Sequence, residues 1–341
     1  MIDSPQKGRQ HHARTMVAAG FRSYGPAEVL GPLDREQPEI RPDTVLVRVA
    51  ASGVNPADWL LRSGRLRFVA RSRLPFVPGA DVAGVVEEVG RAVTRFRPGD
   101  AIYAMLPSVA GGGYAEYAAV AEGAVALAPP NLSLAEAAAV PLAALTALQA
   151  LRDKAGLRAG NHVLINGASG GVGTFAVQIA KVMGARVTAA SSGRNAGLVR
   201  GLGADEVIDY TRQDVTAGDI GYDVVLDAVN VLPVRRASRA LRKGGAFVTV
   251  NPLIGMLSPG WLARFRGGRR VESVFVQPGG ADLETIGAWI SSGKVRPVVD
   301  RTYPLSEAAE AHRYSESKRA RGKLVLVVDE RFAAAESGRG V

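Results

Sequence analysis

The sequence predicts an α/β protein with two domains, a barrel-like β domain and a doubly wound parallel sheet. Between residues 16 and 128, short β-type segments are separated by Pro and Gly turns, which is typical of a compact β domain. Beyond residue 134, strands and helices alternate, which is typical of a parallel sheet covered by helices. With 341 residues, of which 47% are hydrophobic, the chain is long enough to bury a core in each domain.

A glycine-rich turn at residues 167–173 is the feature most closely tied to a function. Residues 163–166 are typical of a short buried strand, and residues 175–182 resume with helical spacing. Such a turn gathers backbone N–H groups and the positive end of a helix dipole, where a pyrophosphate is held. The spacing Ala168-x-Gly170-x-x-Gly173 is the dinucleotide fingerprint with alanine in place of its first glycine. The cofactor-binding residues predicted here are Ser169, Gly170, Gly171, Val172 and Gly173.

Composition narrows the possible chemistry. The chain has 0 Cys, which excludes disulfides, thiolate catalysis and every Cys-based zinc site. The net charge of +10 comes mostly from arginine, with basic stretches at 62–73 and 264–270, but no nucleic-acid recognition motif accompanies it. No apolar run is long enough to span a bilayer, and the first residues lack a secretory signal. We therefore expect a cytoplasmic protein with neither a membrane nor a nucleic-acid partner.

Apolar alternation and turn residues define the elements of the first half. Residues 1–13 are polar and without periodicity, so we expect a disordered arm there. One helix is expected to begin near Pro56, because proline suits the first turn of a helix. Strands are expected at residues 44–50, 84–89, 100–104 and 114–120.

The second half opens with Ser133-Leu134-Ala135-Glu136, which has the form of a capping box. An alanine- and leucine-rich stretch with Pro141 inside it runs from there to Leu151, and it predicts helices at a domain junction. Parallel strands are expected at residues 163–166, 187–190, 206–208, 224–227, 246–250 and 271–276, with helices between the first five. The tail predicts a helix after residue 282, an extended segment at 298–303, a helix from 306, a strand at 323–328 and a frayed end over 331–341.

Several short motifs occur together in one order along the chain. They are Ser52-Gly53-Val54-Asn55-Pro56-Ala57-Asp58, Val77-Pro78-Gly79-Ala80-Asp81-Val82-Ala83-Gly84, Gly112-Gly113-Tyr114-Ala115-Glu116-Tyr117, Pro141-Leu142-Ala143-Ala144-Leu145-Thr146-Ala147 and Arg321-Gly322-Lys323-Leu324-Val325-Leu326. With the glycine turn, they make residues 16–329 resemble the zinc-independent, zeta-crystallin-like quinone oxidoreductase branch of the medium-chain dehydrogenase/reductases. The resemblance implies a GroES-like β-barrel catalytic domain at 1–138, completed by 280–341, around a Rossmann NADPH-binding domain at 139–279.

Two departures from the wider family bear on the chemistry. Zinc-dependent relatives carry a cysteine where this chain has Ser52 or its neighbours, and a histidine where it has Ala80, so no metal site is expected. Quinone reductases of the branch usually carry a tyrosine where this chain has Leu60, beside Trp59. The second departure leaves the substrate open.

The residues after the second parallel strand favour NADPH over NADH. An NAD site needs an Asp or Glu about 20 residues beyond the glycines to accept from the ribose 2′-hydroxyl, and the chain has none there. Ser191, Ser192 and Arg194 suit a 2′-phosphate instead, because a guanidinium binds phosphate through paired charged hydrogen bonds. The alternative is that Arg194 is an ordinary surface arginine.

Further cofactor contacts are expected along the strand ends, where ligands bind in open α/β sheets. The resemblance implies that Tyr210 lies near the ribose phosphate and that Lys323 reaches the cofactor side of the cleft; a core tyrosine and a solvated lysine are the alternatives. Packing alone is the alternative for the remaining candidates. These are Asn230, Val250, Asn251, Phe275 and Val276.

The expected catalytic residues are polar side chains of the family motifs. Asn55 has an amide that can donate to a carbonyl, although Asn before Pro is also a frequent turn residue. Asp58 follows the motif but can also cap the same helix, and Thr146 can approach the nicotinamide or bond back to its own helix. Tyr114 is a less favoured proton donor, so water is the expected proton source.

Together these features predict a zinc-independent oxidoreductase that passes hydride from NADPH to a quinone or to the activated C=C of an enone. An NAD(P)-dependent alcohol dehydrogenase or carbonyl reductase is the alternative within enzymes. A non-catalytic dinucleotide- or RNA-binding protein is the alternative outside them. A homodimer is expected, because the strand at 271–276 would leave an apolar sheet edge.

Overall fold

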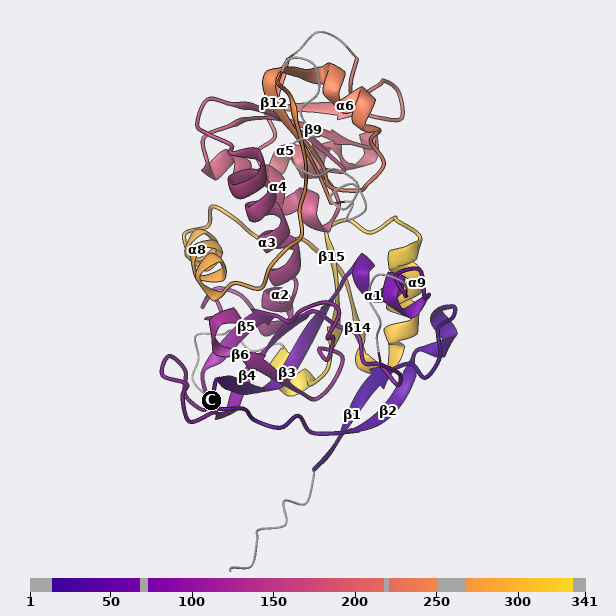
Figure 1. Cartoon of the computed structure of the whole chain (residues 1–341), viewed down its shortest axis with the longest axis vertical. Helices are drawn as coiled ribbons and strands as arrows, with labels where there is room; N and C mark the ends of the chain where they lie inside the picture. Colours follow the sequence, from indigo (N-terminus) through magenta and orange to yellow (C-terminus); the bar gives the residue numbers. More distant parts are fainter. Residues whose placement is uncertain (1–13, 68–72, 218–220, 251–267, 334–341) are drawn as a thin grey trace, which may run out of the picture.

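The computed structural model describes residues 14–67, 73–217, 221–250 and 268–333. Figure 1 shows a helix-covered sheet at one end of the molecule and a β domain at the other, with α2, α3 and β15 between them. The two parts are the β domain and the doubly wound parallel sheet that the sequence predicts, so the expected α/β fold class is confirmed.

The parallel sheet has six strands in the order β10-β9-β8-β11-β12-β13. Its central strand, β8, is an apolar run whose Val163, Leu164 and Ile165 are completely buried, as expected of a strand covered on both faces. The strands are β8 (His162–Asn166), β9 (Arg186–Ser191), β10 (Glu206–Asp209), β11 (Tyr222–Asp227), β12 (Leu241–Thr249) and β13 (Arg270–Ser273).

Helices α4 (Gly171–Val182), α5 (Ala196–Gly201) and α6 (Val234–Ala240) connect these strands. Two expectations are wrong here. The described residues between β10 and β11 form turns rather than a helix, because Asp209 and Asp214 bind the amides two residues later and close local turns. Strand β13 ends at Ser273, so Phe275 and Val276 lie beyond the strand that they were expected to close.

The β domain is built on a seven-stranded sheet in the order β14-β15-β3-β4-β5-β7, with β6 also paired to β3. Strand β3 is almost continuously buried because it pairs with β4, β6 and β15. Strands β1 and β2 form a separate hairpin ribbon. The strands are β1 (Thr15–Gly20), β2 (Gly31–Glu36), β3 (Thr44–Val54), β4 (Asp81–Val89), β5 (Ala101–Met105), β6 (Tyr117–Ala121), β7 (Val125–Leu127), β14 (Val299–Pro304) and β15 (Lys323–Val327).

Helices at the junction join the two sheets. Ser133 caps α2 (Leu134–Ala138) through the predicted capping box, and Pro141 starts α3 (Pro141–Gln149) rather than interrupting one long helix. Helix α3 continues into a π-helical turn, Ala150–Ala155, and one apolar core runs from β3 through α3 to β8. The remaining helices are α1 (Pro56–Arg62), α8 (Gly280–Ser291), α9 (Ala308–Glu316) and α10 (Glu330–Ala333), with 3-10 turns at Ala27–Val29, Glu122–Ala124, Gly193–Asn195 and Leu305–Glu307.

Two expectations concern the ends of the chain. Residues 330–333 form α10 instead of the start of a frayed end, because Phe332 packs under the Arg48 guanidinium. The expected arm at 1–13 lies outside the described residues. Across the described ranges, no helix has the length and apolar character needed to cross a membrane.

Candidate active site

The glycine turn forms a cradle that a nicotinamide dinucleotide fits. Gly167 has φ +79°, which favours glycine, and a Cβ on Gly173 would collide with the carbonyl oxygen of Gly167. Gly170 caps α4, whose first intrahelical bond is Thr174 N to Gly170 O at 2.9 Å. The amides of Gly171, Val172 and Gly173 therefore precede the helical ladder and are available to a pyrophosphate. The predicted Ser169 lies in the same turn.

The last strand of the β domain lies directly against this turn. The amide of Gly322 donates to Ser169 O at 2.9 Å, and Gly322 forms a parallel bridge with Gly170. Gly322 has φ +81°, and a Cβ there would collide with Val298, so only glycine allows this approach. The side chain of Lys323 consequently lies beside Gly171, where its Cδ would be 3.1 Å from an added Cβ.

Lys323 enters a buried polar cluster that joins the two domains. Its Nζ contacts Asp81 Oδ2 at 2.9 Å and donates a short hydrogen bond to Asn55 Oδ1. Asn55 Nδ2 in turn donates to Asp81 Oδ2 at 2.9 Å. All three side chains are buried, so the charges of Lys323 and Asp81 are compensated by each other rather than by water.

Asp81 also fixes the start of α3. Its Oδ1 accepts the amide of Leu142 at 2.6 Å, and its backbone carbonyl accepts the Ser52 hydroxyl at 2.6 Å. Asp81 is therefore bound by groups from β3, α3 and β15. Sequence reasoning did not single out this residue, although a carboxylate directly before the apolar run 82–86 is the signal that identifies it.

Asp58 fixes the backbone of Asn55 and connects it to two further residues. Asp58 Oδ2 accepts hydrogen bonds from the backbone N–H of Asn55 at 2.8 Å and from the Tyr114 hydroxyl at 3.2 Å. Its Oδ1 accepts from the backbone N–H of Gly79 at 3.1 Å. Burial raises the pKa of Asp58 to about 6, although the amides of Asn55 and Gly79 oppose the shift. Asp58 therefore caps helix α1, as the alternative interpretation expected. Its role in catalysis stays a prediction.

Tyr114 extends the buried network to the C-terminal helix α9. Its hydroxyl lies 3.2 Å from His312 Nε2, and both side chains are fully buried. Because Tyr114 donates to the Asp58 carboxylate, it accepts from Nε2–H, which assigns the tautomer of His312. Burial lowers the pKa of His312 to about 3, so its imidazole is neutral.

Thr146 lies on α3 at the junction, as expected. Its hydroxyl donates to Leu142 O at 2.6 Å, which is the bond back to its own helix. A contact of Thr146 with the nicotinamide stays a prediction.

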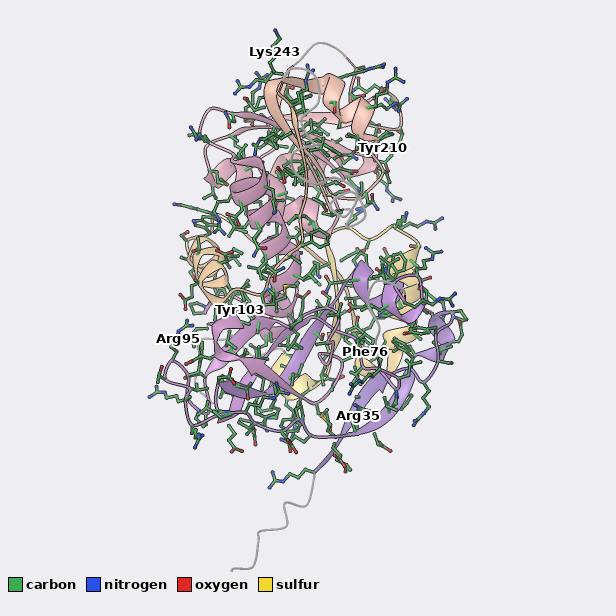
Figure 2. The ribbon with its side chains drawn as sticks, in the orientation of Figure 1. Arg35, Phe76, Arg95, Tyr103, Tyr210 and Lys243 are labelled. Atoms are coloured by element: carbon green, nitrogen blue, oxygen red, sulfur yellow. The ribbon has the colours of Figure 1, made fainter. Side chains whose placement is uncertain are left out.

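The residues expected at the adenosine end lie on neighbouring strand ends. Ser191 pairs with Asp209 across β9 and β10, and the Tyr210 amide donates to Ser191 O at 3.2 Å. Ser191 is buried, Ser192 is half-buried and Arg194 is exposed. Tyr210 is 56% exposed on the flank of the parallel-sheet domain, so it is not a core tyrosine (Figure 2).

The structure adds one acidic group to this end of the site. Asp209 lies close enough to Gly193 that a Cβ on that glycine would collide with its carboxylate. Hydrogen bonds from Thr211, at 2.7 Å to the hydroxyl and 3.0 Å to the amide, lower the pKa of Asp209, with a further contribution from the Gly193 amide. The carboxylate is therefore already engaged by protein donors. No cofactor role was predicted for it, because the acidic residue of an NAD site is expected after the second parallel strand, whereas Asp209 ends the third.

The other predicted contacts lie along the strand ends. Asn230 follows β11 and is exposed with φ +55°, and Val250 follows β12 and is half-buried. Phe275 is exposed and Val276 half-buried beyond the end of β13. Asn251 lies outside the described residues.

This arrangement defines a class of protein. A glycine turn suited to a nicotinamide dinucleotide faces a buried polar cluster from a second domain, which is the layout of a two-domain oxidoreductase. Within the described ranges, no group of three His, Cys, Asp or Glu side chains is placed to hold a metal ion.

Comparison with known proteins agrees with this class. Residues 41–130 match a family model described as alcohol dehydrogenase GroES-like domain, and residues 202–326 match one described as zinc-binding dehydrogenase. The chloroplast envelope quinone oxidoreductase homolog of Arabidopsis thaliana is 34% identical over 327 residues, covering 92% of this chain and 98% of the relative. The NADPH-dependent alkenal/one oxidoreductase of the same plant is 39% identical over 325 residues, covering 92% of this chain and 80% of the relative.

A solved structure is similar over almost the same range. The quinone oxidoreductase from Coxiella burnetii superposes with a TM-score of 0.84 at 31% identity, covering 92% of this chain and all of that one. The chain belongs to the medium-chain dehydrogenase/reductase family, in the branch of the quinone oxidoreductases. The predicted family is confirmed, and with it the prediction of an oxidoreductase that uses a nicotinamide cofactor.

Proposed function

We propose that this protein is an NADPH-dependent, zinc-independent reductase that passes hydride to a quinone or to the activated C=C of an enone. The observation that carries the proposal is the meeting of the glycine turn with the Lys323, Asp81 and Asn55 cluster across the domain junction. The names of the relatives support the substrate class, since they include a quinone oxidoreductase homolog and an alkenal/one oxidoreductase.

Each part of the site has a task in such a reaction. Bound NADPH would supply the hydride. Gly171, Val172 and Gly173 would hold its pyrophosphate through their amides. The buried cluster keeps water away and would offer a hydrogen-bond donor where negative charge develops on the acceptor oxygen. Thr146 would border the nicotinamide from α3.

The preference for NADPH rests on the groups around Gly193. Arg194 is exposed and would meet a 2′-phosphate, with Ser192 on the same loop and Tyr210 on the neighbouring one. Asp209, the carboxylate that could otherwise accept from a ribose hydroxyl, is occupied by Thr211 and Gly193. Both features favour the phosphorylated cofactor over NADH.

Zinc independence rests on what fills the family's metal position. Ser52 is buried and bonded to a backbone carbonyl, and Ala80 is buried and has no ligating atom. Asp81, the carboxylate that follows Ala80 in the sequence, is held by Lys323 and Leu142. With 0 Cys in the chain, the donor set of a zinc alcohol dehydrogenase is absent.

The alternatives receive less support. An alcohol dehydrogenase that lacks zinc would need a group that gives its proton to the alkoxide oxygen, and the hydroxyl of Tyr114 is engaged with Asp58 and His312. A homodimer through β13, at the end of the sheet order, and a cytoplasmic location stay predictions.

The test is turnover by metal-depleted protein. NADPH oxidation would be followed with a quinone, an enone and a simple ketone, with and without added zinc, and the metal content would be measured. The proposal expects quinone or enone reduction that zinc does not increase. Reduction of the ketone alone, or activity that returns only with zinc, would overturn it.

A further inference from the structure

The hydrogen bonds of the buried cluster show which of its side chains still has an N–H group without an acceptor among the described residues. An asparagine amide has two N–H groups, and Asn55 directs Nδ2 to Asp81 Oδ2 at 2.9 Å and to Gly53 O at 3.4 Å. Its Oδ1 accepts from Lys323. Asn55 is thus oriented by its neighbours, and its amide has little capacity left to bind a substrate carbonyl.

Lys323 has a donor left over. An ammonium group has three N–H bonds, and in the described part of the chain two acceptors, Asn55 Oδ1 and Asp81 Oδ2, lie within hydrogen-bond distance of Nζ. The cationic group is held in place by these two contacts, so its third donor has a fixed direction and costs little ordering entropy.

The side chain of Lys323 passes the cofactor turn on its way to the cluster. Its aliphatic stem passes Gly171, at the first turn of α4, and the preceding residue is bridged to Gly170. A lysine that starts a strand on a protein surface would be hydrated, but this side chain is 4% exposed. Such a site strengthens the interaction of a cation with a developing anion, because little water competes for it.

We propose that Lys323 is a catalytic residue that donates a hydrogen bond to the acceptor oxygen as negative charge develops, and that Asn55 and Asp81 are its positioning residues. The proposal rests on the proposed function. When hydride reaches the β-carbon of an enone, the C=C electron pair shifts toward the carbonyl and the oxygen becomes an enolate. Lys323 keeps its proton in this step; water then protonates the α-carbon and leaves a hydroxide ion.

The test uses 4-nitrophenol as a stand-in for the developing oxyanion, because its ionised form is coloured and can be titrated directly. Lys323→Met alone would leave Asp81 buried without a counter-ion and would endanger folding. The variant is therefore Lys323→Met with Asp81→Asn, which removes both charges together. Its matched control is Lys181→Met with Asp205→Asn, which removes an exposed lysine–aspartate pair. Circular dichroism and melting curves would show that each protein is folded.

With saturating NADP⁺, wild type and the control are expected to bind the phenolate, and the Lys323 variant to bind it about 10- to 100-fold more weakly, as the loss of a charged hydrogen bond predicts. Absent phenolate binding by wild type, or equal binding by wild type and the variant, would overturn the proposal. Quinone and enone turnover by the same wild-type preparation tests the proposed function separately, so the two failures are distinguishable.

Discussion

Lys323 and Asp81 form a buried ion pair, with Nζ 2.9 Å from Oδ2, that links the last strand of the β domain to the start of β4. The two residues are 242 positions apart in the sequence. Because Gly322 is bonded to the glycine turn, the same pair also fixes the β domain against the cofactor cradle.

Removing only the lysine charge of this pair is expected to cost more stability than removing both charges. Lys323→Met leaves an uncompensated buried carboxylate, so the free energy of unfolding should fall by about 3–5 kcal/mol. Adding Asp81→Asn should recover part of that loss, because no charge then remains buried. Urea unfolding of the single and double variants measures both values. A double variant less stable than the single one would contradict this prediction.

Asp58 is expected to make stability fall as pH rises through its titration. Burial raises the pKa of Asp58 to about 6, whereas an aspartate in an unfolded chain titrates near 3.9, that is, about two units lower. Between these values the folded protein binds the extra proton, so the unfolding free energy decreases with pH by an amount on the order of 3 kcal/mol.

In Asp58→Asn this titration is absent. Relative to the variant, wild type should therefore lose stability from about pH 4 to pH 6 and change little above that range. Urea unfolding at several pH values checks the difference between the two proteins. Parallel pH profiles for wild type and variant would show that Asp58 does not titrate in this range.

Gly173→Ala is expected to disrupt the cofactor cradle. An added Cβ would collide with the carbonyl of Gly167 and with Ala168 Cα, which are backbone atoms that cannot move aside without distorting the turn. Fluorescence titration should show loss of NADPH binding. Gly197→Ala is the matched control, because nothing lies within 4 Å of its Cβ in α5. The control should bind normally and gain up to about 1 kcal/mol of stability. Normal NADPH binding by Gly173→Ala would mean that the turn does not hold the pyrophosphate.

Arg194→Ala is expected to weaken NADPH binding by about 10- to 100-fold and to leave NADH binding nearly unchanged, because only NADPH carries the 2′-phosphate. Arg200→Ala is the control, since Arg200 is likewise exposed but lies further along α5. Titration of nicotinamide fluorescence with both cofactors measures the effect. Equal losses for NADPH and NADH would remove Arg194 from the specificity site.

The features that the sequence predicted well are those set by neighbouring residues. The strand, turn and helix around Gly173 follow from local spacing, and the capping box of α2 from Ser133 and Glu136. The first and last residues of strands and helices were predicted less well. Strand β13 stops at Ser273 although apolar residues continue beyond it, because pairing with β12 and not hydrophobicity decides where a strand ends.

The candidate site depends on contacts that no local pattern contains. Asn55 and Asp81 were both within recognisable motifs, yet their meeting with Lys323 requires β15 to return to β3 from the far end of the chain. Likewise, His312 has no local signal for its contact with Tyr114, because the packing of α9 on the β domain creates it. Such long-range pairings are set by the topology of the whole chain.

Transfer of an isotope from cofactor to product tests the central claim most directly. Metal-depleted protein would be given NADPH carrying deuterium at the transferable C4 position, together with an enone, and the product would be examined by NMR. Direct hydride transfer from the cofactor predicts deuterium at the β-carbon and solvent hydrogen at the α-carbon. A reduced product without cofactor-derived deuterium, or an enone left unreduced alongside quinones that are also unreduced, would contradict the account.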